Sequence, residues 1–329
     1  MDGRKKTLDW KKKKMNIFKN ECLNDIVIID GMARSGKFYL GKLISGIKDM
    51  EYFISSANID TILALNIAGT LNDADATSLL VNSMNEEIYH LAIGRDLNMR
   101  HDDGSSILNS FEKGLYIDRQ NKGLDGYDGL KKITDNRLSV FMLHQSLQLL
   151  GIVKGAAPKS KIINIRRHPI DLAYSWIKRG WGHRYGKDPL SFQPVYMHNG
   201  NPVPYFAVEW ADEYIDSDEY DRVIKSIVYL TEKESHVINS QQSDICCIFY
   251  ENLVKQADKE MGKIYDFLGR YPHESMDKII NRETRDIAFQ EQRSMKIDYI
   301  SSGADDKFSF DRLLDLGIVY DKNLNNEDV

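Results

Sequence analysis

Apolar positions along the chain form two kinds of pattern. Short apolar runs rich in β-branched residues predict buried strands, and between them apolar residues recur at helical spacing. Runs without polar alternation are typical of parallel strands that helices cover on both faces. The order of these runs predicts an α/β fold, a three-layer sandwich with a central parallel sheet. The predicted strands are residues 25–29, 138–143, 161–165 and 244–250, and the predicted helices include residues 145–151, 169–180, 217–239 and 255–268.

Long stretches between these elements lack a sharp pattern. Residues 60–98 carry scattered Leu and Ile and indicate helices and loops, whereas residues 100–130, rich in Gly, Asp and Asn, predict irregular loops. Residues 182–205 are aromatic and rich in Gly and Pro, which predicts a long loop. We therefore expect one α/β domain over residues 21–329, with helical and loop insertions at about 60–135 and 182–215.

Charge changes the picture mainly at the N-terminus. The 329-residue chain has 44 Lys and Arg against 49 Asp and Glu, a net charge of −5, and 42% hydrophobic residues, typical of a globular protein. Residues 1–14 alone hold seven basic and two acidic residues, so residues 1–20 are predicted to be a disordered basic arm. The acidic remainder argues against nucleic acid as a general partner.

The sequence predicts a cytoplasmic protein without a transmembrane segment. The basic stretch is not followed by the apolar run of a secretory signal, and no apolar segment is long enough to span a membrane. Cys22, Cys246 and Cys247 lack the spacing of metal ligands, and we expect them to be reduced and structural.

Residues 31–38, Gly-Met-Ala-Arg-Ser-Gly-Lys-Phe, join the first predicted strand to a helix. They fit the phosphate loop G-x-x-x-x-G-K-[ST] at every position but the last, where Phe38 lacks the hydroxyl that ligates Mg²⁺. Backbone N–H groups, the helix dipole and the cations of Arg34 and Lys37 would all favour an anion here. The loop is therefore predicted to hold phosphate without a metal.

Two further candidate sites follow other strands. Arg166 and Arg167 end the strand at 161–165, in a segment (residues 159–187) with eight basic residues and a single acid, which indicates a second anion site. His144 directly follows the strand at 138–143. In open parallel sheets the functional crevice lies outside the carboxyl ends of the strands, so all three sites are expected at one edge.

At these residues the sequence resembles the sulfotransferases that use 3′-phosphoadenosine 5′-phosphosulfate (PAPS), a family with the P-loop nucleotide-binding fold. Residues 31–36 are similar to its 5′-phosphosulfate loop, and residues 165–175 look like its 3′-phosphate motif, in which Arg167 and Ser175 match the residues that hold the phosphate. Two further segments agree: His144 to Leu150, which precedes the 3′-phosphate motif, resembles the catalytic histidine segment, and Phe249 to Val254 with Phe267 to Gly269 resembles the Y-E-[DN]-L-V and F-L-G motifs.

The sequence departs from the family pattern at several places. Lys37 and Phe38 replace the paired threonines of the phosphate loop, and Met142 stands where the cytosolic branch usually has a lysine. Glu86 and Glu87 are reserve candidates for the base, because some branches use a glutamate. The C-terminal loop that completes the 3′-phosphate site has only candidates, namely Arg282, Arg285, Arg293 and Lys296.

The resemblance implies transfer of a sulfuryl group from PAPS to a hydroxyl, or less readily an amine, of a small molecule or carbohydrate, with 3′-phosphoadenosine 5′-phosphate (PAP) as product and no metal. His144 would be the general base, and Arg34 with Lys37 would stabilise the developing charge. The nucleotide-binding residues would be Arg34, Ser35, Gly36, Lys37, Phe38, Arg167 and Ser175.

Two other interpretations stay open. Gly36-Lys37 also fits a P-loop kinase or nucleotidase, which predicts ATP with Mg²⁺ as the ligand, although Phe38 speaks against it. The altered loop also fits a non-catalytic nucleotide-binding protein that serves as an interaction module. Neither the acceptor nor the oligomeric state can be predicted from the sequence.

Overall fold

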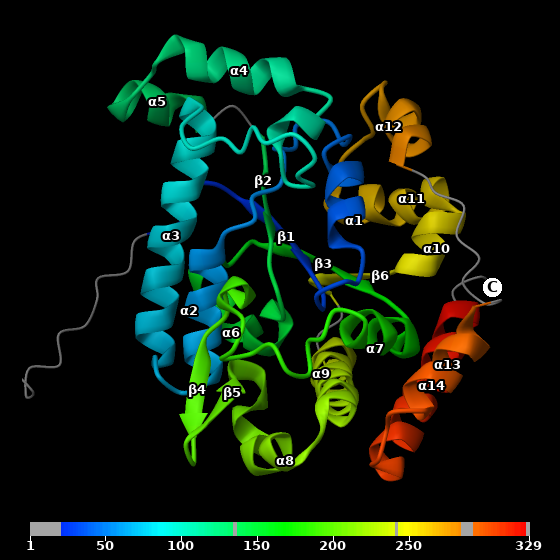
Figure 1. Ribbon diagram of the computed structural model, residues 1–329. Helices are drawn as coiled ribbons and strands as arrows, with labels where there is room; N and C mark the ends of the chain where they lie inside the picture. Colours follow the sequence, from blue (N-terminus) through cyan, green and yellow to red (C-terminus); the bar gives the residue numbers. More distant parts are fainter. Residues whose placement is uncertain (1–20, 134–136, 241–242, 284–291, 327–329) are drawn as a thin grey trace, which may run out of the picture.

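A parallel sheet forms the central layer of the protein. The computed structural model describes residues 21–133, 137–240, 243–283 and 292–326, so the predicted basic arm lies outside the described residues. Within the described part of the chain the sheet has the strand order β2-β1-β3-β6, with all neighbours parallel (Figure 1). The strands are β1 (Ile26–Asp30), β2 (Ser139–Met142), β3 (Lys161–Arg166) and β6 (Ile245–Phe249).

The central strand β1 is buried on both faces. Its side chains alternate between two cores: Val27 and Ile29 lie in one, whereas Ile26 and Ile28 lie in the other. This two-sided burial explains why the predicted strands are apolar without alternation. The prediction of a three-layer α/β sandwich with a central parallel sheet is confirmed.

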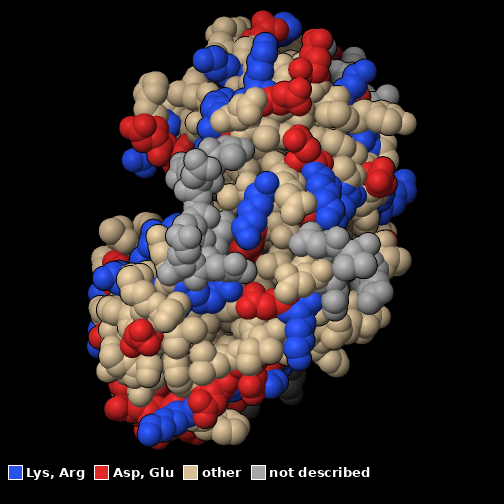
Figure 2. All heavy atoms as spheres, turned by 90° about the vertical axis from the view of Figure 1, so that its right-hand side faces the viewer, with Lys and Arg blue, Asp and Glu red and all other residues tan. Residues whose placement is uncertain are grey.

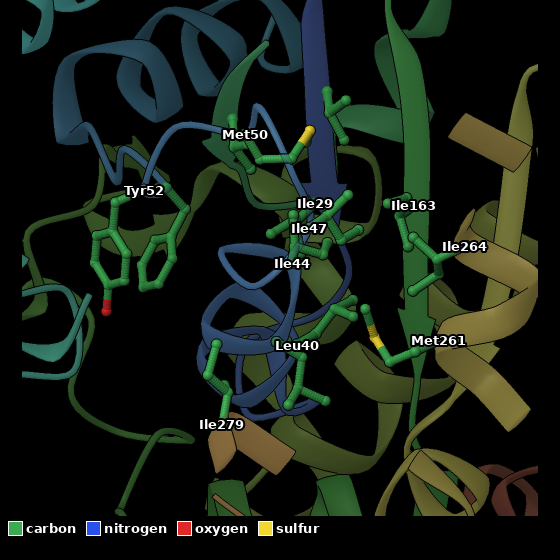
Figure 3. Close-up of a cluster of buried hydrophobic side chains, with 14 of the residues drawn as sticks. Ile29, Leu40, Ile44, Ile47, Met50, Tyr52, Ile163, Met261, Ile264 and Ile279 are labelled. Atoms are coloured by element: carbon green, nitrogen blue, oxygen red, sulfur yellow. The ribbon is translucent and has the colours of Figure 1, made fainter. Parts of the chain in front are cut away.

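Helices cover both faces of the sheet. Figure 3 shows the first core, where Leu40 and Ile44 meet Ile29 of β1, Ile163 of β3 and Met261. Its helices are α1 (Lys37–Ile44), α11 (Ala257–Leu268) and α12 (Met276–Glu283), with α10 (Tyr250–Lys255) leading into α11. The second core packs α2 (Ala57–Ile67), α3 (Asp73–Ile93) and α6 (Leu150–Ala156), the last preceded by the 3-10 turn η3 (Ser146–Leu149), against the other face.

A third apolar cluster lies beside the sheet and surrounds Trp176. It includes residues of the C-terminal helices and of the helix that follows β3, and the C-terminal helices pack against that helix. Its elements are α7 (Pro169–Ile177), β5 (Asn201–Pro204), the 3-10 segment η5 (Tyr205–Trp210), α8 (Ala211–Asp216), α9 (Glu219–Ser240), α13 (Arg293–Ser301) and α14 (Lys307–Asn326).

Two predicted loop regions contain regular structure. Residues 100–130 were expected to be irregular, but they include the 3-10 turn η2 (Ile107–Asn109), α4 (Lys113–Lys122) and most of α5 (Gly126–Ile133), so that prediction is wrong. The glycines mark helix ends: Gly123 caps α4 with φ 57°.

The predicted long loop at 182–205 also contains regular structure. It holds the 3-10 turn η4 (Pro189–Ser191) and an antiparallel hairpin of β4 (Val195–His198) with β5. None of the helices among the described residues is long and apolar enough to cross a membrane.

Candidate functional site

Side chains from other elements donate to two carbonyl oxygens of the loop between β1 and α1. The Ala33 carbonyl accepts from Trp176 Nε1 at 3.0 Å, and the Arg34 carbonyl accepts from the Arg167 guanidinium at 2.9 Å. Arg34 itself has a φ of 74°, in the left-handed region. The N–H groups of the first turn of α1 have no partner within the helix, so together with the loop they form an anion-binding concavity.

Lys37 lies beneath this loop. Its side chain is buried, and its ammonium donates to the Gly31 carbonyl. Burial lowers the pKa of Lys37 to about 8, although the carboxyl groups of Asp30, Asp60 and Glu234 act in the opposite direction. The ammonium thus ties the start of the loop to its end.

Three arginines gather at the mouth of the loop. Burial lowers the pKa of Arg34, and the like charges of Arg179 and Arg167 lower it further. The Arg167 guanidinium lies 5.0 Å from the centre of the Tyr250 ring, which holds it by a cation–π contact. Like charges held close together are costly in the free protein, so this arrangement favours binding of a polyanion.

His144 is positioned by the end of β2 and by α2. Its backbone N–H donates to Asp60 Oδ1 at 2.9 Å, and its Nδ1 lies 2.9 Å from Asp60 Oδ2. The next residue, Gln145, has a φ of 58°, and Ser146 donates to the buried Asp30 from both its N–H and its hydroxyl at 2.7 Å. These contacts hold His144 at the carboxyl edge of the sheet. Sequence reasoning did not find Asp60.

A cavity of about 560 Å³ joins the loop to His144. This volume lies within the range of about 300–1,000 Å³ that is typical of ligand sites. Phe38, 44% exposed, forms one wall and packs edge-to-face against Phe53 with centroids 5.7 Å apart. The cavity is lined by Ala33, Arg34, Gly36, Lys37, Phe38, Tyr39, Lys42, Asp102, Gly104, His144, Arg167, Trp181, Tyr250, Val254 and Glu283.

A second cavity, of about 250 Å³, lies on the other side of His144. Both Asp60 and His144 line it, together with Phe192 and the buried Tyr205. His144 is the residue that lines both cavities among the described residues. The site therefore places one imidazole between a cationic cavity and a second, smaller one.

The structure places other predicted residues away from the first cavity. Ser35 is buried within the loop, and Ser175 lies on α7 outside the cavity lining. Glu86 and Glu87 lie on α3 and do not line either cavity beside His144.

The candidates for the C-terminal loop take part in other contacts. Lys296 donates to the buried Asp171, and Arg293 pairs with Asp171 and with Asp321. Arg282 contacts Glu283 at 2.8 Å, and Arg285 lies outside the described residues. Arg293 and Lys296 therefore fasten the C-terminal helices to α7.

Comparison with known proteins identifies the class. The model of the sulfotransferase domain family matches residues 24–311, most of the chain. The chain belongs to this family, and sulfuryl transfer is the reaction that the family supports. The resemblance to the sulfotransferase family is thus confirmed. No curated protein matches the sequence.

Solved structures of sulfotransferases are remote matches. The sulfotransferase domain of the Synechococcus PCC 7002 olefin synthase is 12% identical, covers 94% of this chain and 98% of its own, with a TM-score of 0.47. A mouse sulfotransferase complexed with PAP is 17% identical over 82% and 67%, with a TM-score of 0.38. A sulfotransferase from Alicyclobacillus acidocaldarius is 14% identical over 89% and 95%, with a TM-score of 0.39.

Proposed function

We propose that this sulfotransferase uses PAPS as donor and a hydroxyl-bearing small molecule or carbohydrate as acceptor, with His144 as the general base. The observation that carries the proposal is the position of His144, which lines both the cationic cavity and the smaller one. A base must lie within reach of both the nucleotide and the acceptor for proton removal to accompany sulfuryl transfer.

The residues of the first cavity fit a sulfated nucleotide. The Trp181 indole N–H, from a residue that lines this cavity, is buried and has no hydrogen-bond partner among the described residues, so it is available to donate to a ligand. Arg34 and Arg167 supply positive charge at the mouth of the loop. Bound PAPS would supply the sulfuryl group and leave as PAP.

His144 would act on the acceptor. Its imidazole takes the hydroxyl proton as the acceptor oxygen bonds to sulfur, and the bridging oxygen leaves with the nucleotide, so the proton ends on the imidazole. Arg34 would stabilise the charge that develops on the departing oxygens. Lys37 donates a hydrogen bond to the Gly31 carbonyl, so it would stabilise the loop rather than contact the sulfuryl group directly.

A thermal-shift comparison tests the donor. PAP should stabilise the protein by about 2.7 kcal/mol at 100 times its dissociation constant, while AMP and ATP with Mg²⁺ should do so only at much higher concentrations. Arg167→Ala should weaken the binding of PAP far more than the binding of AMP. His144→Ala should keep the response to PAP and lose most turnover of PAPS.

The control is Arg312→Ala on α14, which removes an exposed guanidinium that is paired with Glu232 of α9 and lines neither cavity beside His144. This variant should behave as the wild type. Stabilisation by ATP with Mg²⁺ rather than by PAP would favour a kinase or nucleotidase. If Arg167→Ala lost the same affinity for PAP as for AMP, the role of Arg167 in binding the 3′-phosphate would be contradicted.

A further inference from the structure

Asp60 makes two hydrogen bonds to one residue. Its Oδ1 accepts from the backbone N–H of His144 and its Oδ2 faces Nδ1 of the same residue, both at 2.9 Å. Asp60 lies in the first turn of α2, and its side chain and that of His144 are each 26% exposed. The Asp60 carboxylate therefore contacts both the backbone N–H and the ring of His144, with one oxygen for each.

This geometry selects one tautomer of the imidazole. A carboxylate oxygen can only accept, so Nδ1 must carry the proton. In the neutral ring Nε2 is then unprotonated and has its lone pair available. Nε2 is the nitrogen that a general base needs, since Nδ1 is occupied by Asp60.

Asp60 also contributes charge to the second cavity. Among the described residues that line this cavity there is no Lys or Arg, and Asp60 is the acid. The lining also includes uncharged side chains with hydroxyl, amide or ring groups, namely Ser55, Thr61, Ser191, Gln193, Phe192 and Tyr205. An acceptor with a carboxylate or phosphate would meet the Asp60 charge without a compensating cation.

We propose that Asp60 is a positioning residue that holds His144 in the Nδ1–H tautomer and makes the second cavity select acceptors without negative charge. The proposal rests on the proposed function, because it assigns the second cavity to the acceptor. Its first part concerns a tautomer that exists in the free protein, so it is measurable even where no turnover is found.

Two substitutions of Asp60 separate positioning from a structural role. In Asp60→Asn the backbone N–H of His144 donates to the amide oxygen, so the amide NH₂ faces Nδ1. Because this NH₂ can only donate, it favours the opposite tautomer, with the proton on Nε2. Asp60→Ala leaves both tautomers accessible. A structural role would make the isosteric Asn variant the milder one, whereas the positioning role makes it the more damaging.

The tautomer is read by ¹⁵N NMR of histidine-labelled protein, with the His144 signals assigned by their loss in His144→Ala. The wild type should show Nδ1–H, Asp60→Asn should show Nε2–H, and Asp60→Ala should show a mixture. With PAPS and 4-methylphenol, kcat of Asp60→Asn should fall by about 10²- to 10⁴-fold and lie below that of Asp60→Ala. PAP binding should change far less than kcat in both variants.

Two matched probes test the choice of acceptor. In PAP-saturated protein, 4-methylphenol should shift the His144 signals at concentrations at least about tenfold lower than 4-hydroxybenzoate, a difference of about 1.4 kcal/mol. Asp60→Asn should reduce the ratio between the concentrations of 4-hydroxybenzoate and 4-methylphenol that shift the signals.

Three outcomes would overturn the proposal: an Nε2–H tautomer in the wild type, a higher kcat in Asp60→Asn than in Asp60→Ala, or equal binding of both probes. Failure of PAP to bind would instead remove the proposed donor and leave the tautomer result standing.

Discussion

Gly36 lies where both the backbone and its surroundings exclude a side chain. Its φ is 105°, and a Cβ atom there would lie 2.3 Å from the Tyr250 ring. The same ring makes the cation–π contact to Arg167, so a shift of the ring would disturb that contact. The close approach of Tyr250 to the loop shapes the first cavity, which both residues line, and glycine at this position makes it possible.

Gly36→Ala should cost about 1–3 kcal/mol of unfolding free energy and weaken PAP binding, because the loop must shift to relieve the collision. Urea unfolding and a PAP titration measure the two effects. The matched control is Gly151→Ala on α6, where no atom lies within 4 Å of the new Cβ and stability should be unchanged or rise by about 0.5–1 kcal/mol. Equal costs for the two variants would contradict the role of Tyr250.

Single residues differ in how far the sequence predicts them. Arg34, His144 and Arg167 could be found because each follows an apolar strand, and the carboxyl ends of parallel strands share one edge. Asp60 is 84 residues from His144, on a helix whose apolar spacing gives no clear phase. Its pairing depends on how α2 packs on the sheet, which is a property of the tertiary structure rather than of any local pattern.

At the scale of elements, α7 begins at a buried histidine. His168 is the N-cap residue: its Nδ1 accepts from the Ile170 N–H at 3.2 Å, and its side chain is 2% exposed. Burial lowers the pKa of His168 to about 4, and the charge of Arg293 acts in the same direction, while Asp321 and Asp171 oppose it. The helix that follows Arg167 thus starts from a neutral imidazole.

This shift makes stability depend on pH. An unfolded histidine titrates near pH 6.5, so between about pH 6.5 and 4 the unfolded state binds a proton that the native state does not. Stability should therefore fall as the pH falls through this window, by up to about 1.4 kcal/mol per pH unit. His168→Asn keeps a capping side chain without the titration, and its unfolding free energy should fall less steeply.

Urea unfolding at several pH values between 7 and 4 measures the effect. Other groups titrate in the same range, so the difference between wild type and variant is the informative quantity. His236→Asn, at an exposed position on α9, is the control and should keep the wild-type slope. A His168→Asn slope equal to that of the wild type would show that His168 protonates equally well in both states.

Local signals predicted the sheet better than its insertions. The strands of the sheet were predicted to within about a residue or two, because continuous apolar runs report burial on both faces. The hairpin of β4 and β5 was missed, although Asn199-Gly200 is a common two-residue turn and both residues have positive φ, 48° and 78°. Glycines in residues 100–130 were taken as loop residues, whereas Gly123 ends α4 and Gly126 begins α5.

At the scale of the whole molecule, the lining of the first cavity has more basic than acidic residues, although the chain as a whole is acidic. Figure 2 shows Lys and Arg mixed with Asp and Glu over the face that carries α10 to α14. The chain has a net charge of −5, yet Arg34, Arg167 and Lys42 line the same cavity. A small polyanion would be attracted locally while the protein as a whole repels extended polyanions.

The C-terminal helices are fastened to the nucleotide side of the molecule by buried charges. Lys296 on α13 donates to Asp171 on α7, and Arg293 lies 3.6 Å from the same carboxylate and 3.3 Å from Asp321 on α14. Asp171 is 1% exposed. The ion pairs therefore link α13 and α14 to the helix that directly follows Arg167.

Lys296→Met should remove the main partner of a buried carboxylate and cost about 3–5 kcal/mol of unfolding free energy, towards the lower end because Arg293 remains close. The double variant with Asp171→Asn should cost less than the sum of the two single changes, since no unpaired charge is left. Urea unfolding gives these energies, with Lys322→Met at an exposed position of α14 as the control. PAP binding should weaken in Lys296→Met because a loosened α7 no longer holds Arg167 in place. A cost no greater than that of Lys322→Met would mean that apolar packing alone docks the C-terminal helices.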